Sequence, residues 1–151
     1  MRIYLDNCCY GRPYDDQSSE KIKLESESII NIQELIKSKK IKLATSFMLH
    51  YENLKKKDIA KRKRIDKFLR EYRETYIGIE YFDKLQESTK SIIETGIKEK
   101  DAYHVASAII ANCKYFLTVD ERLLKYKSDE IILMNPIDFV KMLEAVKNEW
   151  L

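Results

Sequence analysis

Two aspartates follow short apolar segments, at places where a buried strand would end. Asp6 comes directly after residues 3–5, and Asp120 follows residues 115–119. In an open α/β sheet, ligands gather beyond the carboxyl ends of the strands, near the point where the strand order reverses. An unpaired carboxylate in such a partly buried place is costly, but an aspartate can also simply end a strand and start a turn. For each residue alone, both interpretations stay open.

Two further acids fall on expected helices, on the faces that should point inward. Asp101 shares a helical face with Val105 and Ala108, and Glu52 shares one with Met48. The alternatives are ordinary ones. Asp101 could be an acid stabilised by the dipole at a helix N-terminus, and Glu52 could form a salt bridge with a nearby lysine.

Taken together, the four acids suggest a ring of carboxylates at one edge of a sheet. Carboxylates placed so close repel one another and raise one another's pKa values unless a cation neutralises them. Oxygen ligands without a histidine or cysteine cluster favour Mg²⁺ or Mn²⁺ over Zn²⁺. Such ions bind phosphate oxygens and activate water, which is the chemistry of phosphodiester hydrolysis.

Helix and strand patterns alternate along the chain, so that each acid is assigned to a specific element. We expect strands at residues 3–5, 41–46, 75–80, 114–120 and 130–135, and helices at residues 19–39, 46–53, 55–74, 81–94, 99–112, 121–126 and 136–148. Strands separated by helices imply parallel pairing. The predicted fold is therefore α/β, a three-layer α/β/α sandwich with a central, mainly parallel sheet of about five strands, in a single domain over residues 1–151.

The composition agrees with a folded protein in a reducing compartment. The chain is 44% hydrophobic and 35% charged, with a formal net charge of +3 that permits an anionic partner without requiring one. Its three cysteines form no metal-ligand pattern and are expected to be reduced thiols. No apolar run approaches the roughly 18 residues that a membrane span needs. We therefore expect a cytoplasmic location and no membrane partner.

Four short motifs resemble the PIN-domain nucleases, in order and in approximate position across almost the whole chain. They are "YLD" at the start, "SFMLHYE" after the second expected strand, "KDAYHVASA" on the small-residue helix and "LTVD" after the fourth strand. The segment "LDNCCYGRPYDDQ" further resembles a prokaryotic PIN subgroup in which the first strand runs into an Arg-Pro loop.

The resemblance implies a Mg²⁺- or Mn²⁺-dependent endoribonuclease that hydrolyses RNA, often the toxin of a toxin–antitoxin pair. It also implies a cognate antitoxin protein and a homodimer as expected partners. The catalytic and metal-binding residues carried over from the motifs are Asp6, Glu52, Asp101 and Asp120, with Thr118 offering its hydroxyl to an acid or to a metal-bound water. One departure is Asn7, which stands where many relatives have Thr or Ser and which could still orient a water or a phosphate oxygen.

Basic residues close to the acids are candidates for binding RNA phosphates. The run of residues 55–70 follows Glu52 and includes Lys61, Arg62 and Arg64. The same run could instead be a solvated helix face, because acids are interspersed in it. Arg12 could bind phosphate from its loop or pair with a neighbouring aspartate, and His104 is expected to be a packed or hydrogen-bonded helix residue.

Two other functions compete with the nuclease. A phosphatase with an aspartyl nucleophile would also place an aspartate after the first strand, but such enzymes commonly have a second aspartate two residues later, where this chain has Cys8. The other alternative is a catalytically inactive PIN-fold module that binds nucleic acid or protein.

Overall fold

The computed structural model describes residues 1–149, which fold around one parallel sheet. Its strand order is β3-β2-β1-β4-β5, and every neighbouring pair is parallel. The strands are β1 (Arg2–Leu5), β2 (Lys42–Ser46), β3 (Arg73–Ile77), β4 (Tyr115–Leu117) and β5 (Ile132–Met134). The predicted five-stranded parallel α/β fold is confirmed.

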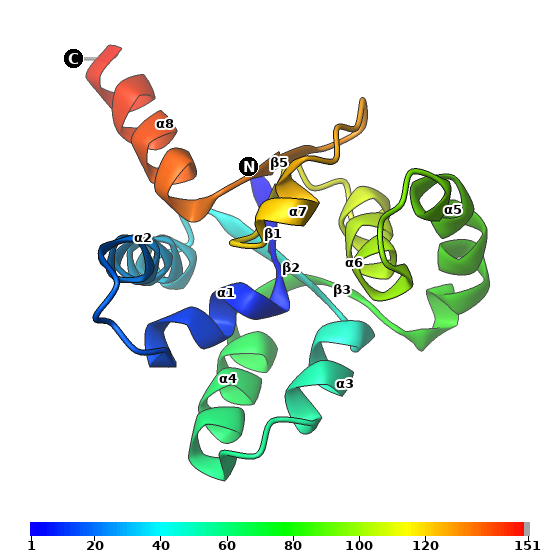
Figure 1. Ribbon diagram of the computed structural model, residues 1–151, viewed down its shortest axis with the longest axis horizontal. Coiled ribbons are helices and arrows are strands. Elements are labelled where there is room, and N and C mark those ends of the chain that lie inside the picture. Colours follow the sequence, from blue (N-terminus) through cyan, green and yellow to red (C-terminus); the bar gives the residue numbers. More distant parts are fainter. Residues whose placement is uncertain (150–151) are drawn as a thin grey trace.

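Helices cover both faces of this sheet. Figure 1 shows α2 and α8 on one side of the strands and α5 and α6 on the other. The helices are α1 (Asn7–Gly11), α2 (Glu20–Lys37), α3 (Phe47–Leu54), α4 (Ile59–Tyr72), α5 (Phe82–Glu94), α6 (Glu99–Ile110), α7 (Glu121–Leu124) and α8 (Pro136–Glu149), with short 3₁₀ turns η1 (Arg12–Tyr14) and η2 (Ile79–Tyr81). The layers are those of an α/β/α sandwich.

The central strand β1 is apolar because it is buried on both faces. Ile3, Tyr4 and Leu5 are all fully buried, as expected for a strand covered by helices on both sides. Phe116 of β4 pairs with Tyr4 in register, and their rings stack with centroids 5.3 Å apart. From β1 the chain first adds β2 and β3 on one side and later β4 and β5 on the other. The strand order therefore reverses between β1 and β4, which makes the carboxyl ends of these two strands the switch point.

Small residues let helix α6 approach the sheet closely. Ala102, Ala106 and Ala108 are buried to 1% exposure or less, and α6 packs against β2. The start of α6 thereby comes close to the carboxyl ends of the strands, and this is the part of the helix that carries Asp101.

One helix was not expected and several expected boundaries were wrong, among them the ends of β3 and β4, which lie at Ile77 and Leu117 rather than at residues 80 and 120. Residues 7–11 form α1, which no apolar periodicity in this short segment indicated. Helix α4 begins at Ile59 rather than at residue 55, because the Asp58 side chain accepts the N–H of Lys61 and caps the helix there. Strand β3 begins at Arg73, two residues before the expected start, because Arg73 is already in register with Leu43 of β2.

Within residues 1–149, none of the helices combines the length and the apolar character that a bilayer span requires.

Candidate functional site

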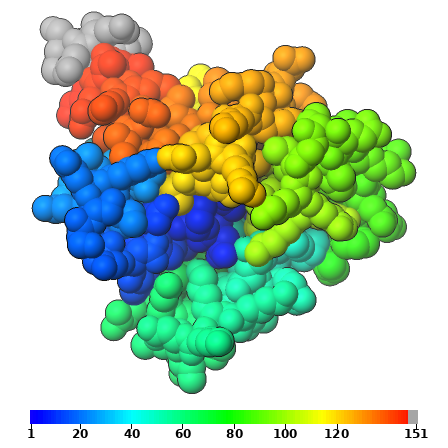
Figure 2. All heavy atoms as spheres, in the orientation of Figure 1, coloured from blue at the N-terminus to red at the C-terminus, as the bar shows by residue number. Residues whose placement is uncertain are grey.

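Four segments that are distant in the sequence meet on one face of the molecule. In Figure 2 the N-terminal segment (blue) is bordered by the segments near residues 50 (cyan-green), 100 (yellow-green) and 120 (yellow). These segments are the end of β1, helix α3, the start of α6 and the turn after β4. Each carries one of the four acids that the sequence singled out.

Asp6 is held firmly at the end of β1, where it is only 6% exposed. Its backbone N–H donates to the carbonyl of Leu117 at 2.9 Å, which ties the end of β1 to the end of β4. One carboxylate oxygen accepts the N–H of Asn7 at 2.8 Å, so that Asp6 also caps α1. Asp6 therefore does end a strand and start a helix, and the same contacts fix its carboxylate at the switch point.

Thr118 connects Asp6 with the turn that carries Asp120. The Thr118 side chain is fully buried, and its hydroxyl donates to the second carboxylate oxygen of Asp6 at 2.8 Å. The same hydroxyl oxygen accepts the backbone N–H of Asp120 at 3.1 Å. Asp120 is exposed and caps α7, where its carboxylate accepts the N–H of Arg122 at 2.9 Å. A single buried hydroxyl thus sets the relative positions of two acidic segments.

Asp101 faces the other two aspartates. It is half-buried in the first turn of α6. Burial raises its pKa, and the negative charges of Asp6 and Asp120 raise it further, while His104 and Lys98 offset only part of the effect. Asp6 and Asp120 therefore both lie within electrostatic reach of Asp101.

Glu52 belongs to a buried hydrogen-bond chain instead. Its carboxylate, 6% exposed, makes a short hydrogen bond with Nε2 of His104, which is itself 1% exposed. The Nδ1 atom of His104 lies 2.6 Å from the Tyr4 hydroxyl, which lies 2.8 Å from the hydroxyl of Ser46. All three hydrogen bonds are satisfied when Ser46 donates to Tyr4, Tyr4 to Nδ1 and Nε2–H to Glu52. His104 is therefore the hydrogen-bonded helix residue that the sequence predicted.

Glu52 is also paired with a lysine. The Lys100 ammonium lies 3.3 Å from its second carboxylate oxygen. Burial opposes ionisation of Glu52, but the hydrogen bond from His104 and the nearby positive charges outweigh it and lower its pKa. Glu52 thus differs from Asp101, because its charge is already compensated by the chain.

The three aspartates fit a divalent cation by their chemistry. They offer only oxygen ligands, which suit Mg²⁺ or Mn²⁺, and the raised pKa of Asp101 marks negative charge that a cation would compensate. Among residues 1–149, however, no three His, Cys, Asp or Glu side chains are arranged to coordinate one ion as they lie. The structure therefore brings the candidate ligands to one place without closing them around a site.

The basic candidates lie in different surroundings. Nη1 of Arg12 donates to Asp15 at 3.1 Å, and its Nε lies 3.2 Å from a carboxylate oxygen of buried Glu25, so neighbouring acids balance its charge. Arg62 donates to the carbonyl of Leu54 at 3.3 Å. Arg12 is therefore paired with acids, whereas Arg62 makes one hydrogen bond to a backbone carbonyl.

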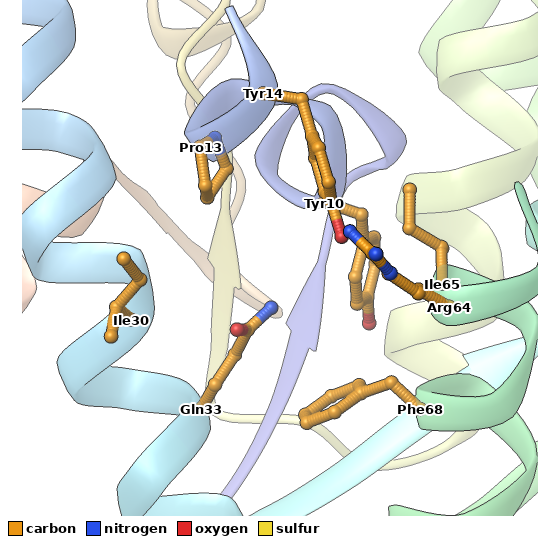
Figure 3. A pocket seen from close by; sticks show the side chains of 8 residues that line it. All are labelled: Tyr10, Pro13, Tyr14, Ile30, Gln33, Arg64, Ile65 and Phe68. Atoms are coloured by element: carbon orange, nitrogen blue, oxygen red, sulfur yellow. The ribbon is translucent and has the colours of Figure 1, made fainter. Parts of the chain in front are cut away.

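Lys61 and Arg64 project from α4 toward α1 and η1. The Lys61 ammonium lies 5.4 Å from the ring centroid of Tyr14. Exposed Arg64 borders a hollow of about 320 Å³ between α1, α2 and α4, shown in Figure 3. That hollow is lined by Tyr10, Pro13, Tyr14, Ile30, Gln33, Arg64, Ile65 and Phe68. Because no carboxylate lines it, the hollow is not the place where a metal would bind.

Three residues near the acids were missed as site residues by the sequence reasoning. The Cys8 sulfur lies 3.4 Å from both Asp6 and Thr118, although the sequence indicated no more for this cysteine than a reduced thiol. Lys100 immediately precedes Asp101, and nothing in the sequence indicates that it pairs with Glu52, which lies on a different helix. Lys56 carries a buried ammonium group, and nothing in a run of three lysines distinguishes it from its neighbours.

Comparison with known proteins shows likeness in structure rather than in sequence. No family model matches the chain, and no curated protein matches it. Solved structures do match. The crystal structure of VapBC2 from Rickettsia felis, bound to a DNA fragment from their promoter, matches this chain with a TM-score of 0.55 and 20% sequence identity. The match covers 89% of this chain and 98% of that chain.

Two further solved structures agree. A structure of FitAB bound to an IR36 DNA fragment has a TM-score of 0.54 and 16% identity, over 89% of this chain and 95% of that chain. The crystal structure of FitAcB from Neisseria gonorrhoeae matches with a TM-score of 0.54 and 16% sequence identity, over 89% of this chain and 97% of that chain. At these identities the likeness shows a shared fold over most of the chain.

Proposed function

The chain has a PIN-like fold, and on that premise we propose that it is a Mg²⁺- or Mn²⁺-dependent endoribonuclease that hydrolyses RNA phosphodiester bonds. One observation carries the proposal. The negative charges of Asp6 and Asp120 act on Asp101 near the switch point of the sheet, where a ligand is expected in an open α/β fold. Charge that the protein leaves uncompensated in a fixed place favours a cationic ligand.

Asp6, Asp101 and Asp120 would hold the cation in this proposal. When bound, a divalent ion supplies a more acidic water and stabilises the negative charge that develops on a phosphate. The protein fixes the positions of the side chains that would bind this ion. The Thr118 hydroxyl and the Asn7 backbone N–H hold the Asp6 carboxylate in one orientation, so that little reorganisation is needed when a ligand arrives.

Glu52 has a separate role in the proposal. His104 and Lys100 keep its carboxylate ionised and fixed in direction. An ionised, immobile carboxylate can accept a hydrogen bond from the attacking water or complete the ligand set of the ion. Its partners make the first of these roles the better suited, because metal binding would have to compete with Lys100.

The neighbouring basic residues Lys61, Arg62 and Arg64 would bind RNA phosphates. Arg12 would contribute less to this binding, because Asp15 and Glu25 already balance its charge. A polyanion is attracted to such residues through the release of its counterions.

The test is metal-dependent cleavage of RNA. Purified protein is incubated with a mixture of RNAs and Mn²⁺, with and without EDTA, and compared with the variants Asp6→Asn and Asp101→Asn. We expect cleavage that EDTA abolishes and that falls by at least about 100-fold in both variants, since even the loss of an outer partner of a metal ligand costs 10- to 100-fold. Asp83→Asn, a change of an exposed aspartate in the first turn of α5, is the matched control.

Equal cleavage by the wild type and both variants would identify a contaminating nuclease and contradict the proposal. RNA binding without cleavage would favour the alternative, a PIN-fold module that is catalytically inactive. One observation favours that alternative, namely that the acids among residues 1–149 do not form a closed metal site as they lie.

The proposed function also includes protein partners. Two of the solved structures with this fold, VapBC2 and FitAB, are bound to DNA, in one case a fragment from their promoter. We propose by analogy that this chain pairs with an antitoxin protein and also forms a homodimer.

A further inference from the structure

Lys56 carries a buried positive charge that the chain does not pair. It lies in the short connection between α3 and α4, four residues after Glu52. Its ammonium nitrogen is shielded from solvent, and no residue within 1–149 accepts a hydrogen bond from it. An ammonium group buried in this way loses its hydration without gaining a partner, which is among the costlier arrangements in a protein.

The charges around Lys56 connect it with the acidic site. Burial and, to a smaller extent, the positive charge of Lys61 lower the pKa of Lys56 to about 8, although Glu52 and Cys8 act in the opposite direction. Cys8 in turn contacts Asp6. Lys56 therefore lies on the α3 side of the site, within electrostatic reach of Glu52.

Lys61 approaches the same region from the first turn of α4. Its ammonium lies 3.7 Å from the point where a side chain on Gly11 would begin, so it extends across to the end of α1. The two lysines are close enough for each charge to affect the other. Two ammonium groups that repel each other, one of them without any acceptor, form a place that an anion would stabilise.

The exposed lysines nearby are different. Lys55 lies over the Tyr51 ring with its ammonium 4.2 Å from the centroid, and Lys57 is exposed to solvent. Water hydrates the charge of an exposed lysine, so neither Lys55 nor Lys57 indicates a missing ligand. Among these three consecutive lysines, only Lys56 has a buried and unpaired ammonium.

We propose that Lys56 and Lys61 form a phosphate-binding subsite that holds an RNA phosphate beside the aspartates. The inference deepens the proposed nuclease function and rests on it. The phosphate oxygens would accept hydrogen bonds from the Lys56 ammonium, for which residues 1–149 provide no acceptor. Cys8, whose charge acts on Lys56, also contacts Asp6, so a phosphate bound there would lie near that end of the acidic site.

The first test is RNA binding in EDTA, where no cleavage takes place. Fluorescence anisotropy of a short fluorescein-labelled single-stranded RNA compares the wild type with Lys56→Met, Lys61→Met and Lys57→Met. We expect Lys56→Met to weaken binding by about tenfold, as loss of one charge-assisted hydrogen bond does, and to reduce the slope of affinity against salt by about 0.7. Lys57→Met should cost less than about threefold.

The second test is thermal unfolding with and without inorganic phosphate. Lys56→Met should be at least as stable as the wild type, because it removes an unpaired buried charge, and phosphate should raise the Tm of the wild type more than that of the variant. A less stable Lys56→Met protein whose RNA affinity and phosphate response match the wild type would overturn the inference and make Lys56 a structural residue.

The two proposals fail in distinguishable ways. If RNA is never cleaved but Lys56→Met still loses RNA and phosphate binding, the nuclease proposal fails and the subsite stands. If RNA is cleaved with metal and Lys56→Met and Lys61→Met bind RNA like the wild type, the subsite fails and the nuclease proposal stands. A response to free phosphate without an effect on RNA binding would also overturn the inference, since the subsite would then not serve RNA.

Discussion

At the scale of single residues, Thr118 explains how an aspartate can both shape the fold and serve a site. Asp6 caps a helix, and such a cap needs only one carboxylate oxygen. The second oxygen receives the Thr118 hydroxyl, which also fixes the backbone of Asp120. Local structure and chemistry are therefore not competing explanations of Asp6. Its capping contact and its contact with Thr118 together leave the carboxylate one orientation.

Replacing Thr118 with valine should lower both the affinity for the metal and the stability of the fold. The variant keeps the shape of the side chain but leaves an Asp6 oxygen without its donor, a loss of about 2 kcal/mol in the free energy of unfolding. We expect Mn²⁺ affinity, measured by isothermal titration calorimetry, to fall by about 10- to 100-fold.

Thr45→Val is the matched control for this variant. Thr45 is also fully buried at the end of a strand, but its hydroxyl has no hydrogen-bond partner within residues 1–149. Its replacement should leave both stability and Mn²⁺ affinity close to those of the wild type. If both threonine variants bind Mn²⁺ like the wild type, Thr118 does not position the metal ligands.

At the scale of elements, the sequence predicted what depends on periodicity and missed what depends on packing. The buried strands and the amphipathic helices were found because their apolar spacing is visible in the sequence. Helix α1 was missed because it is five residues long, and its start is set by Asp6 together with the neighbouring strand β4. The start of β3 was shifted by two residues because its register depends on pairing with β2.

An ion pair across the sheet allows a test of how its strands are held together. Arg2 of β1 lies 2.8 Å from Glu74 of β3, although β2 separates the two strands. The hydrogen bonds from Arg2 and Thr75 lower the pKa of Glu74 to about 2. The lowered pKa means that this stabilisation is present above the ordinary pKa near 4.5 and is lost as the pH falls toward about 2.

The variant Glu74→Gln should therefore be less stable than the wild type at pH 7 by up to about 1 kcal/mol, a modest value because both side chains are partly exposed to solvent. Urea unfolding at pH 7, 5 and 3 measures the difference, which should shrink between pH 5 and pH 3. A difference that stays constant over this range would show that the charge of Glu74 does not act through Arg2.

At the scale of the whole molecule, the order of the strands is what gathers the acids. Residues 6, 101 and 120 come together because β1 and β4 are neighbours and α6 packs on the adjoining face. Sequence motifs singled out these three acids, and their joint role as cation ligands stays a prediction. The motifs could not predict that Lys100 and His104 compensate Glu52, or that Lys56 is left unpaired, because those facts depend on side-chain contacts between elements.

The central claim is that these distant aspartates bind one divalent cation together. Anomalous diffraction from crystals grown with Mn²⁺ tests it most directly, because manganese gives a signal that water does not. We predict a peak within coordination distance, about 2.2 Å, of carboxylate oxygens of Asp6, Asp101 and Asp120. Crystals saturated with Mn²⁺ that show no peak among these three side chains would contradict the account.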